Sequence, residues 1–190
     1  GKAEDAALFL LEIEWIRAGF RPAQSGANQS VSQRSRNMSP LFSIKPEAIA
    51  FVDAADKQTI LELLSEVFAR SWGLDAAQVL EQLEEREKLG STGFGRGVAI
   101  PHARFPGVTR PVAALLKLRH PADFASADGL PVDLVVGLLS PENSGATHLH
   151  ALAAISRLMR DERVHEALSD APDEEALYGL LTNATDRDAA

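Results

Sequence analysis

Cysteine is absent from the 190-residue sequence, which excludes disulfide bonds and thiolate metal sites. The absence also fits the reducing cytoplasm, where we expect the protein to act. No stretch approaches the roughly 20 consecutive apolar residues that span a membrane. No signal-peptide pattern of a charged start, an apolar core and a small-residue cleavage site is present either. We therefore expect no membrane insertion.

Basic residues are outnumbered by acidic ones, 19 Lys and Arg against 27 Asp and Glu, and the formal net charge is −8. An acidic chain is poorly suited to bind a phosphate backbone without sequence preference, so we predict no nucleic-acid partner. Aromatic residues make up only 6% of the chain, but 45% of it is hydrophobic. That composition and length suffice for one domain with a substantial core.

Composition divides the chain near residue 37. Residues 1–18 have a helical pattern with apolar side chains spread widely around the axis, and residues 22–37 form a polar tract typical of a linker. We therefore assign 1–37 to an N-terminal extension and linker of unknown role, 38–184 to the main domain, and 185–190 to a tail.

The main domain alternates between helical and strand-like periodicity. Capping residues predict helices that begin after Asp56, Asp75, Thr147 and Asp173 and that end near Gly73, Gly90, Met159 and Leu181. Short apolar runs with β-branched residues predict buried strands over 98–100, 112–118 and 132–139. This order predicts an α/β domain in which helices cover a sheet.

The stretch GSTGFGRGVAIPHAR, residues 90–104, has the glycine content of a nucleotide-binding loop but not its context. A P-loop needs Lys-Ser/Thr after its last glycine, and a dinucleotide fingerprint needs a strand before the glycines and a helix after them. Here a helix precedes them and a strand follows, so we interpret the stretch as a turn into a short strand ending at Pro101-His102. Stiffened by Pro101, His102 is placed to be an exposed reactive group, although this stretch alone favours an ordinary surface or hydrogen-bonded histidine.

Arg86 lies on the same helix face as Val79 and Leu83, in the last turn before Gly90. Its stem can pack while its guanidinium reaches the residues after Gly90, where it would suit a phosphate group. The alternative is a cation that only complements the helix dipole.

His148 shares a helix face with Leu152, Ile155 and Met159, so it is predicted to point toward the core, and His150 toward solvent. The start of a helix favours anions, which makes His148 a plausible companion to a phosphate. A buried histidine with one hydrogen bond is the alternative. The rings of a His-x-His pair diverge on a helix, and no third ligand is indicated, so we predict no metal site.

The run REKLGSTGFGRGVAIPHAR resembles the phosphorylation-site signature of the type 2 IIA domains of the bacterial phosphotransferase system. Glu87, Phe94-Gly95 and 98–103 carry the signature, and the likeness is greatest to the nitrogen-regulatory branch. The similarity extends over about 41–182, including DGLPVDLVVGLLSPE and HLHALAAISRLM.

This resemblance implies a single domain with a mixed β-sheet flanked by helices on both faces, as in the mannitol-specific IIA proteins. It implies that His102 accepts a phosphoryl group from an HPr-like phosphohistidine carrier protein, that His148 is a second active-site histidine and that Arg86 stabilises the phosphate. Imidazole, with a pKa of about 6.5 in water, is largely neutral and nucleophilic near pH 7. The turn would form a phosphate loop from Ser91, Thr92, Gly93, Gly95 and Gly97. No cofactor and no metal is required.

Three functional hypotheses follow. In the first, phosphorylation switches the interaction with regulated target proteins, as in the nitrogen-regulatory branch. In the second, the protein passes the phosphoryl group to a IIB domain during fructose or mannitol uptake. In the third, it keeps the fold as a binding module without phosphotransfer. The joint presence of Arg86, His102 and His148 argues against the third.

Overall fold

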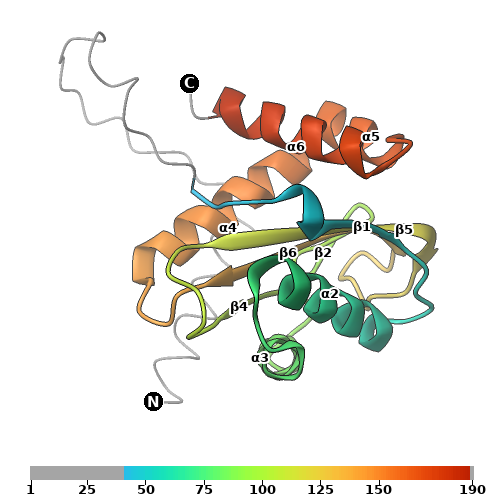
Figure 1. Ribbon diagram of the computed structural model, residues 1–190. Helices are drawn as coiled ribbons and strands as arrows, with labels where there is room; N and C mark the ends of the chain where they lie inside the picture. The colour runs from blue at the N-terminus through green and yellow to red at the C-terminus, as the bar shows by residue number, and fades with distance from the viewer. Residues whose placement is uncertain (1–40, 189–190) are drawn as a thin grey trace, which may run out of the picture.

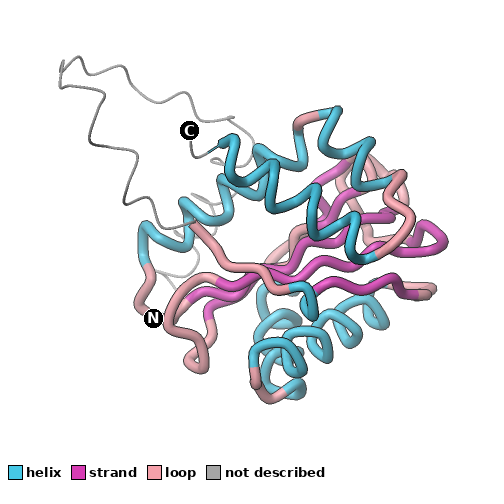
Figure 2. The backbone as a smooth tube through the Cα atoms, turned by 45° about the horizontal axis from the view of Figure 1, so that its top comes forward, coloured by secondary structure: helices cyan, strands magenta, loops and turns pink. Residues whose placement is uncertain are grey.

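The computed structural model describes residues 41–188, in which a mixed β-sheet lies between two layers of helices (Figures 1 and 2). The helix and linker predicted over 1–37 lie outside the described residues. For residues 41–188, the predicted fold class is confirmed. A short 3-10 helix, η2 (Pro46–Ala48), leads into the first strand.

The sheet has the order β1-β5-β6-β3-β2, with β4 also paired to β6. Pairing is parallel for β1 with β5 and for β3 and β4 with β6, and antiparallel for the other neighbours. Helices cover both faces, so β6 and residues 112–118 of β5 are mostly apolar and buried. The strands are β1 (Ile49–Val52), β2 (Gly93–Gly95), β3 (Val98–Ala99), β4 (His102–Arg104), β5 (Val112–Ala122) and β6 (Val132–Ser140).

Helices α2 (Lys57–Trp72) and α3 (Ala76–Lys88) cover one face of the sheet, as Figure 1 shows below the strands. Both begin where the sequence predicts, because the carboxylates of Asp56 and Asp75 accept backbone N–H groups of the first turn. Helix α2 ends at Gly73, whose φ of 68° is the left-handed conformation that glycine adopts without a Cβ clash.

Helices α4 (Gly145–Arg160), α5 (Glu162–Ser169) and α6 (Glu174–Asp188) cover the opposite face. The predicted cap at Thr147 is wrong: α4 begins at Gly145, and the N–H of Thr147 donates to the carbonyl of Ser144. The end predicted near Met159 is confirmed, and Asp161 caps a separate helix, α5, that the sequence did not predict. The start predicted for the last helix is confirmed, although α6 runs beyond Leu181.

The strand predicted to end at Pro101-His102 is in fact two short strands, β3 and β4, which pair in succession with β6. Pro101 has no N–H to donate and lies between them, while its carbonyl accepts the N–H of Leu138. His102 therefore begins a strand rather than ending one. Its backbone is held by the sheet, and its register partner is Leu138.

Candidate functional site

The candidate site is centred on the ring of His102, both of whose nitrogens have hydrogen-bond partners. Nδ1 lies 2.8 Å from the carbonyl oxygen of Ile100, and the Nε–H of Arg86 donates to Nε2 across 3.0 Å. A carbonyl can only accept and a guanidinium can only donate. The two contacts together therefore require the neutral ring with its proton on Nδ1 and its lone pair on Nε2.

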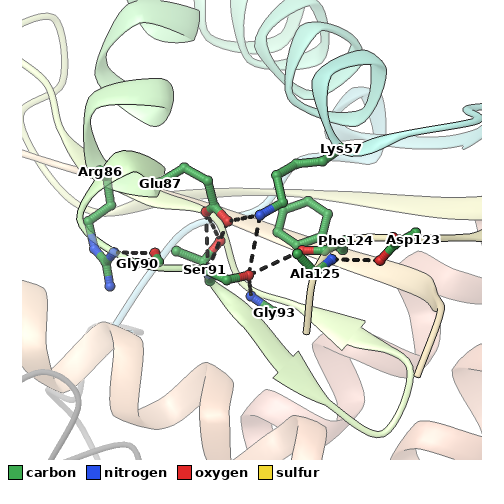
Figure 3. Close-up of polar contacts among 10 residues, drawn as sticks. Lys57, Arg86, Glu87, Gly90, Ser91, Gly93, Asp123, Phe124 and Ala125 are labelled. Atoms are coloured by element: carbon green, nitrogen blue, oxygen red, sulfur yellow. Dashed lines mark hydrogen bonds and ion pairs between the residues drawn. The ribbon is translucent and has the colours of Figure 1, made fainter. Parts of the chain in front are cut away.

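Arg86 comes from the last turn of α3, where Val79 and Leu83 of the same face are buried. Its Nη1 donates to the carbonyl of Gly90 at 3.1 Å (Figure 3). The guanidinium therefore uses separate N–H groups for the loop and for His102. The predicted reach of this side chain past Gly90 is confirmed. Because Arg86 also contacts the His102 ring, its role is not limited to complementing the helix dipole.

His148 lies beside His102, with their ring centroids 5.7 Å apart and the ring planes tilted by 44°. Its Nδ1 is 2.9 Å from Oγ of Ser140, the last residue of β6. The inward direction predicted for His148 is confirmed by its exposure of 2%, and His150 is exposed as predicted. The first turns of α4 and the end of β6 thus place a second imidazole at the site.

His102 itself is only 2% exposed, so the expectation of an exposed reactive group is wrong. The reason is its place at the start of a strand paired with the central strand β6, on the face that α4 covers. Alternation along β4 turns Ala103 to the opposite face. Burial removes competing water from the ring, so its protein hydrogen bonds determine where its proton sits.

The predicted phosphate-loop residues make contacts away from the His102 ring. The N–H of Thr92 donates to the carboxylate of Glu87, and that of Gly93 donates to Oγ of Ser91. A Cβ placed on Gly95 or Gly97 would meet a carboxylate oxygen 3.1 Å away, from Asp128 and Asp133 respectively. Acidic neighbours and occupied amides do not favour the binding of an anion. A phosphate-binding role therefore gains no support from these contacts and stays a prediction for Ser91, Thr92, Gly93, Gly95 and Gly97.

Sequence reasoning missed Ser140 and gave Glu87 no role. Ser140 ends the apolar run of β6, and only the pairing of β4 with β6 brings that strand end next to His102. Glu87 was recognised as part of a signature, but the partners of its carboxylate come from α2 and from the loop after Gly90. No periodicity in the sequence reports such contacts between segments.

Among residues 41–188, no group of three or more His, Cys, Asp or Glu side chains is placed to hold a metal ion. In the same part of the chain, no helix combines the length and the apolar character needed to cross a membrane.

Residues 43–184 match the family model described as "Phosphoenolpyruvate-dependent sugar phosphotransferase system, EIIA 2". The chain belongs to this EIIA 2 family. The resemblance of the 86–104 run to a IIA signature is thereby confirmed, and the matched segment contains Arg86, His102 and His148.

Among the proteins that this chain resembles, those named as nitrogen regulatory proteins have the higher sequence identities. A nitrogen regulatory protein of Bradyrhizobium diazoefficiens is 44% identical over 140 residues, which is 73% of this chain and 91% of the relative. The crystal structure of nitrogen regulatory protein IIA-Ntr from Neisseria meningitidis is 34% identical, with a TM-score of 0.68 over 73% of this chain and 95% of that one. The IIA mannitol structure from Escherichia coli shares the fold, with a TM-score of 0.62 at 22% identity over 74% of this chain and 99% of that one.

Proposed function

We propose that this EIIA 2 protein is a phosphotransferase that accepts a phosphoryl group on Nε2 of His102 from an HPr-like phosphohistidine carrier protein. The observation that carries the proposal is the tautomer required by the contacts of the ring, which places the nucleophilic lone pair on Nε2. In the transfer, the P–N bond of the donor histidine breaks and a P–Nε2 bond forms. The donor ring takes back its electron pair as the His102 ring becomes cationic.

The carbonyl of Ile100 supports this step because it accepts the Nδ1–H of His102, and that hydrogen bond strengthens as positive charge develops on the ring. Arg86 has to release Nε2 before attack, since its Nε–H occupies the same lone pair. The guanidinium can then bind the phosphoryl oxygens, whose negative charge is the main demand that phosphoryl transfer makes on a protein. Arg86 thus protects the nucleophile at rest and stabilises the group it receives.

His148 is proposed as a second donor to the phosphoryl group, supported by the 5.7 Å between the ring centroids. Its bond to Ser140 holds the ring in one orientation, and the nearby start of α4 favours negative charge. With His102 and Arg86 it completes a site that requires no metal or cofactor.

We infer a regulatory role, in which the phosphorylation state of His102 alters the interaction with target proteins. The 44% identity to a protein named for nitrogen regulation supports this role over sugar uptake, since relatives named as fructose-specific EIIABC and EIIA components are 31% identical and the mannitol structure, at 22%, supports the fold alone. A phosphoryl group adds about two negative charges at His102, enough to change which partner binds. The absence of cysteine fits action in the cytoplasm.

Incubation of the full chain with phosphoenolpyruvate and the general phosphotransferase proteins tests the proposed chemistry. The wild type and a His150→Ala control, altered at the exposed histidine of α4, should take up acid-labile phosphate, and His102→Ala should take up none. Phosphate uptake by His102→Ala, or none by the wild type, would refute the proposal. A His148→Ala variant that reacts at the wild-type rate would remove His148 from the mechanism.

The regulatory role is tested separately by adding fructose-type and mannitol-type IIB domains to the phosphorylated protein. A regulator should retain its phosphoryl group in the presence of these domains. Rapid transfer to either one would favour the sugar-uptake alternative.

A further inference from the structure

We propose that Glu87 is a positioning residue for His102, acting through the loop 90–92, which holds the partners of both ring nitrogens. The predicted effect on the rate of phosphoryl transfer rests on the proposed function. The predicted effect on the tautomer of the His102 ring does not. In this proposal, the glycine-containing loop 90–92 positions the His102 ring rather than binding phosphate.

The Glu87 carboxylate is buried, with its side chain 8% exposed, and it is surrounded by donors. Lys57, the first residue of α2, donates from Nζ at 2.8 Å, and the N–H of Thr92 lies 3.0 and 3.1 Å from the two oxygens. The Thr92 hydroxyl donates to the same carboxylate. Glu87 therefore joins α2, α3 and the loop at one point, as Figure 3 shows. A buried carboxylate satisfied in this way holds its donors in place, because moving them would leave a charge unpaired.

One path runs from Glu87 to Nδ1 of His102. The N–H of Thr92 donates to the Glu87 carboxylate, and the carbonyl of Thr92 accepts the N–H of Ile100 at 3.0 Å. The carbonyl of Ile100 in turn faces Nδ1 of His102 at 2.8 Å. A shift of Thr92 would therefore move the acceptor that keeps the ring proton on Nδ1.

A second path runs to Nε2 through the backbone of Glu87, so a change of the Glu87 side chain leaves its first hydrogen bond in place. The backbone carbonyl of Glu87 accepts the N–H of Gly90 at 3.1 Å, and the carbonyl of Gly90 accepts Nη1 of Arg86 at 3.1 Å. The Nε–H of Arg86 then donates to Nε2. The loop thus determines where the guanidinium stands relative to the nucleophile.

The loop is supported from the opposite side as well. Oγ of Ser91 donates to the carbonyl of Phe124 at 3.1 Å and accepts the N–H of Gly93 at 3.1 Å. Lys57 Nζ is also 3.4 Å from that hydroxyl and 4.8 Å from the centroid of the Phe124 ring. Loss of the Glu87 carboxylate should therefore loosen residues 90–92 without unfolding them.

The test compares the full-length wild type with Glu87→Ala, Glu87→Gln and a control, Glu85→Gln. Glu85 lies on the same helix, but its side chain is 61% exposed and pairs with Lys88. Nitrogen-15 NMR of the imidazole rings reports the tautomer of His102, and transfer from the phosphorylated carrier gives kcat and KM. A merely structural role would lower the melting temperature without altering the tautomer.

Glu87→Ala should show a mixture of the two His102 tautomers and a kcat lower by about 10- to 100-fold, because small displacements of a reacting group cost that much. Its KM for the carrier should stay within about twofold. Glu87→Gln, whose amide cannot accept from all the donors, should change both quantities in the same direction by less. It carries the test if Glu87→Ala does not fold, and Glu85→Gln should match the wild type.

A folded Glu87 variant that keeps the wild-type His102 tautomer would overturn the proposal, whatever its transfer rate. Failure of the wild type to accept phosphate would refute the proposed function instead. The tautomer measurement would still decide the positioning role in that case.

Discussion

The Nε–H of Arg86 donates to Nε2 of His102 across 3.0 Å, so the cation suited to a phosphoryl group already contacts the atom proposed to receive it. This contact keeps the lone pair of Nε2 in a defined direction. It also means that the guanidinium has to release Nε2 before attack, since both contacts need the same lone pair. Preorganisation of this kind lowers the reorganisation needed when charge develops.

Replacement of Arg86 by lysine should lower the rate of phosphoryl transfer to His102 by about 10²-fold, the cost typical of removing one stabilising donor at a reacting centre. The ammonium group keeps the charge but lacks the rigid fork that serves Gly90 and His102 together. Rapid-quench measurement of phosphate uptake gives the rate. Arg110→Lys, at an exposed position, is the control, and an Arg86→Lys rate within about threefold of the wild type would contradict the prediction.

Replacement of Gly137 by alanine should destabilise the fold by about 1–3 kcal/mol, the usual cost of overpacking. A Cβ at this position in β6 would lie 2.7 Å from Cε2 of Phe68 and 2.8 Å from Cδ1 of Leu64, both on α2. Gly179→Ala in α6 is the matched control, because its Cβ meets nothing within 4 Å. It should be neutral or stabilising by about 0.5–1 kcal/mol, since glycine weakens a helix interior. Urea unfolding measures both, and equal stability of the two variants would be unexpected.

The cap of α2 predicts a dependence of stability on acid pH. The backbone hydrogen bond from Thr59 is the largest of the contacts that hold the pKa of Asp56 below 3.8. A carboxyl whose pKa is lower when folded stabilises the fold above its unfolded pKa, and this contribution is lost as pH falls through the folded pKa. Asp56→Asn keeps a good cap but cannot titrate. The melting temperature of the wild type relative to Asp56→Asn should therefore fall as the pH is lowered from about 5 through the folded pKa of Asp56, whereas a constant difference would count against this assignment.

Much of the local structure followed from the sequence. The capping carboxylates of Asp56 and Asp75 and the glycine after α2 marked helix ends, because each satisfies backbone groups within a few residues. The cap predicted at Thr147 was wrong because α4 begins after Ser144, whose side chain makes no capping hydrogen bond.

The helix faces of Arg86 and His148 were also predictable, since periodicity alone determines which side chains point together. Their partners were not. Ser140 meets His148 only because β6 ends beneath the start of α4, and Lys57 meets Glu87 only because α2 packs on α3. The burial of His102 likewise depends on its pairing with β6.

The sequence by itself determined the helices that Asp56 and Asp75 cap and the apolar runs of the central strands, because these depend on short-range spacing. Its resemblance to a known signature proposed Arg86, His102 and His148 for phosphoryl chemistry. The tertiary structure alone decided which nitrogen of His102 holds the lone pair. That choice depends on a carbonyl, a guanidinium and a carboxylate-held loop brought together by strand pairing and helix packing. Hydrogen bonds act over about 3 Å, so their effect on the nucleophile exists only once the chain has folded.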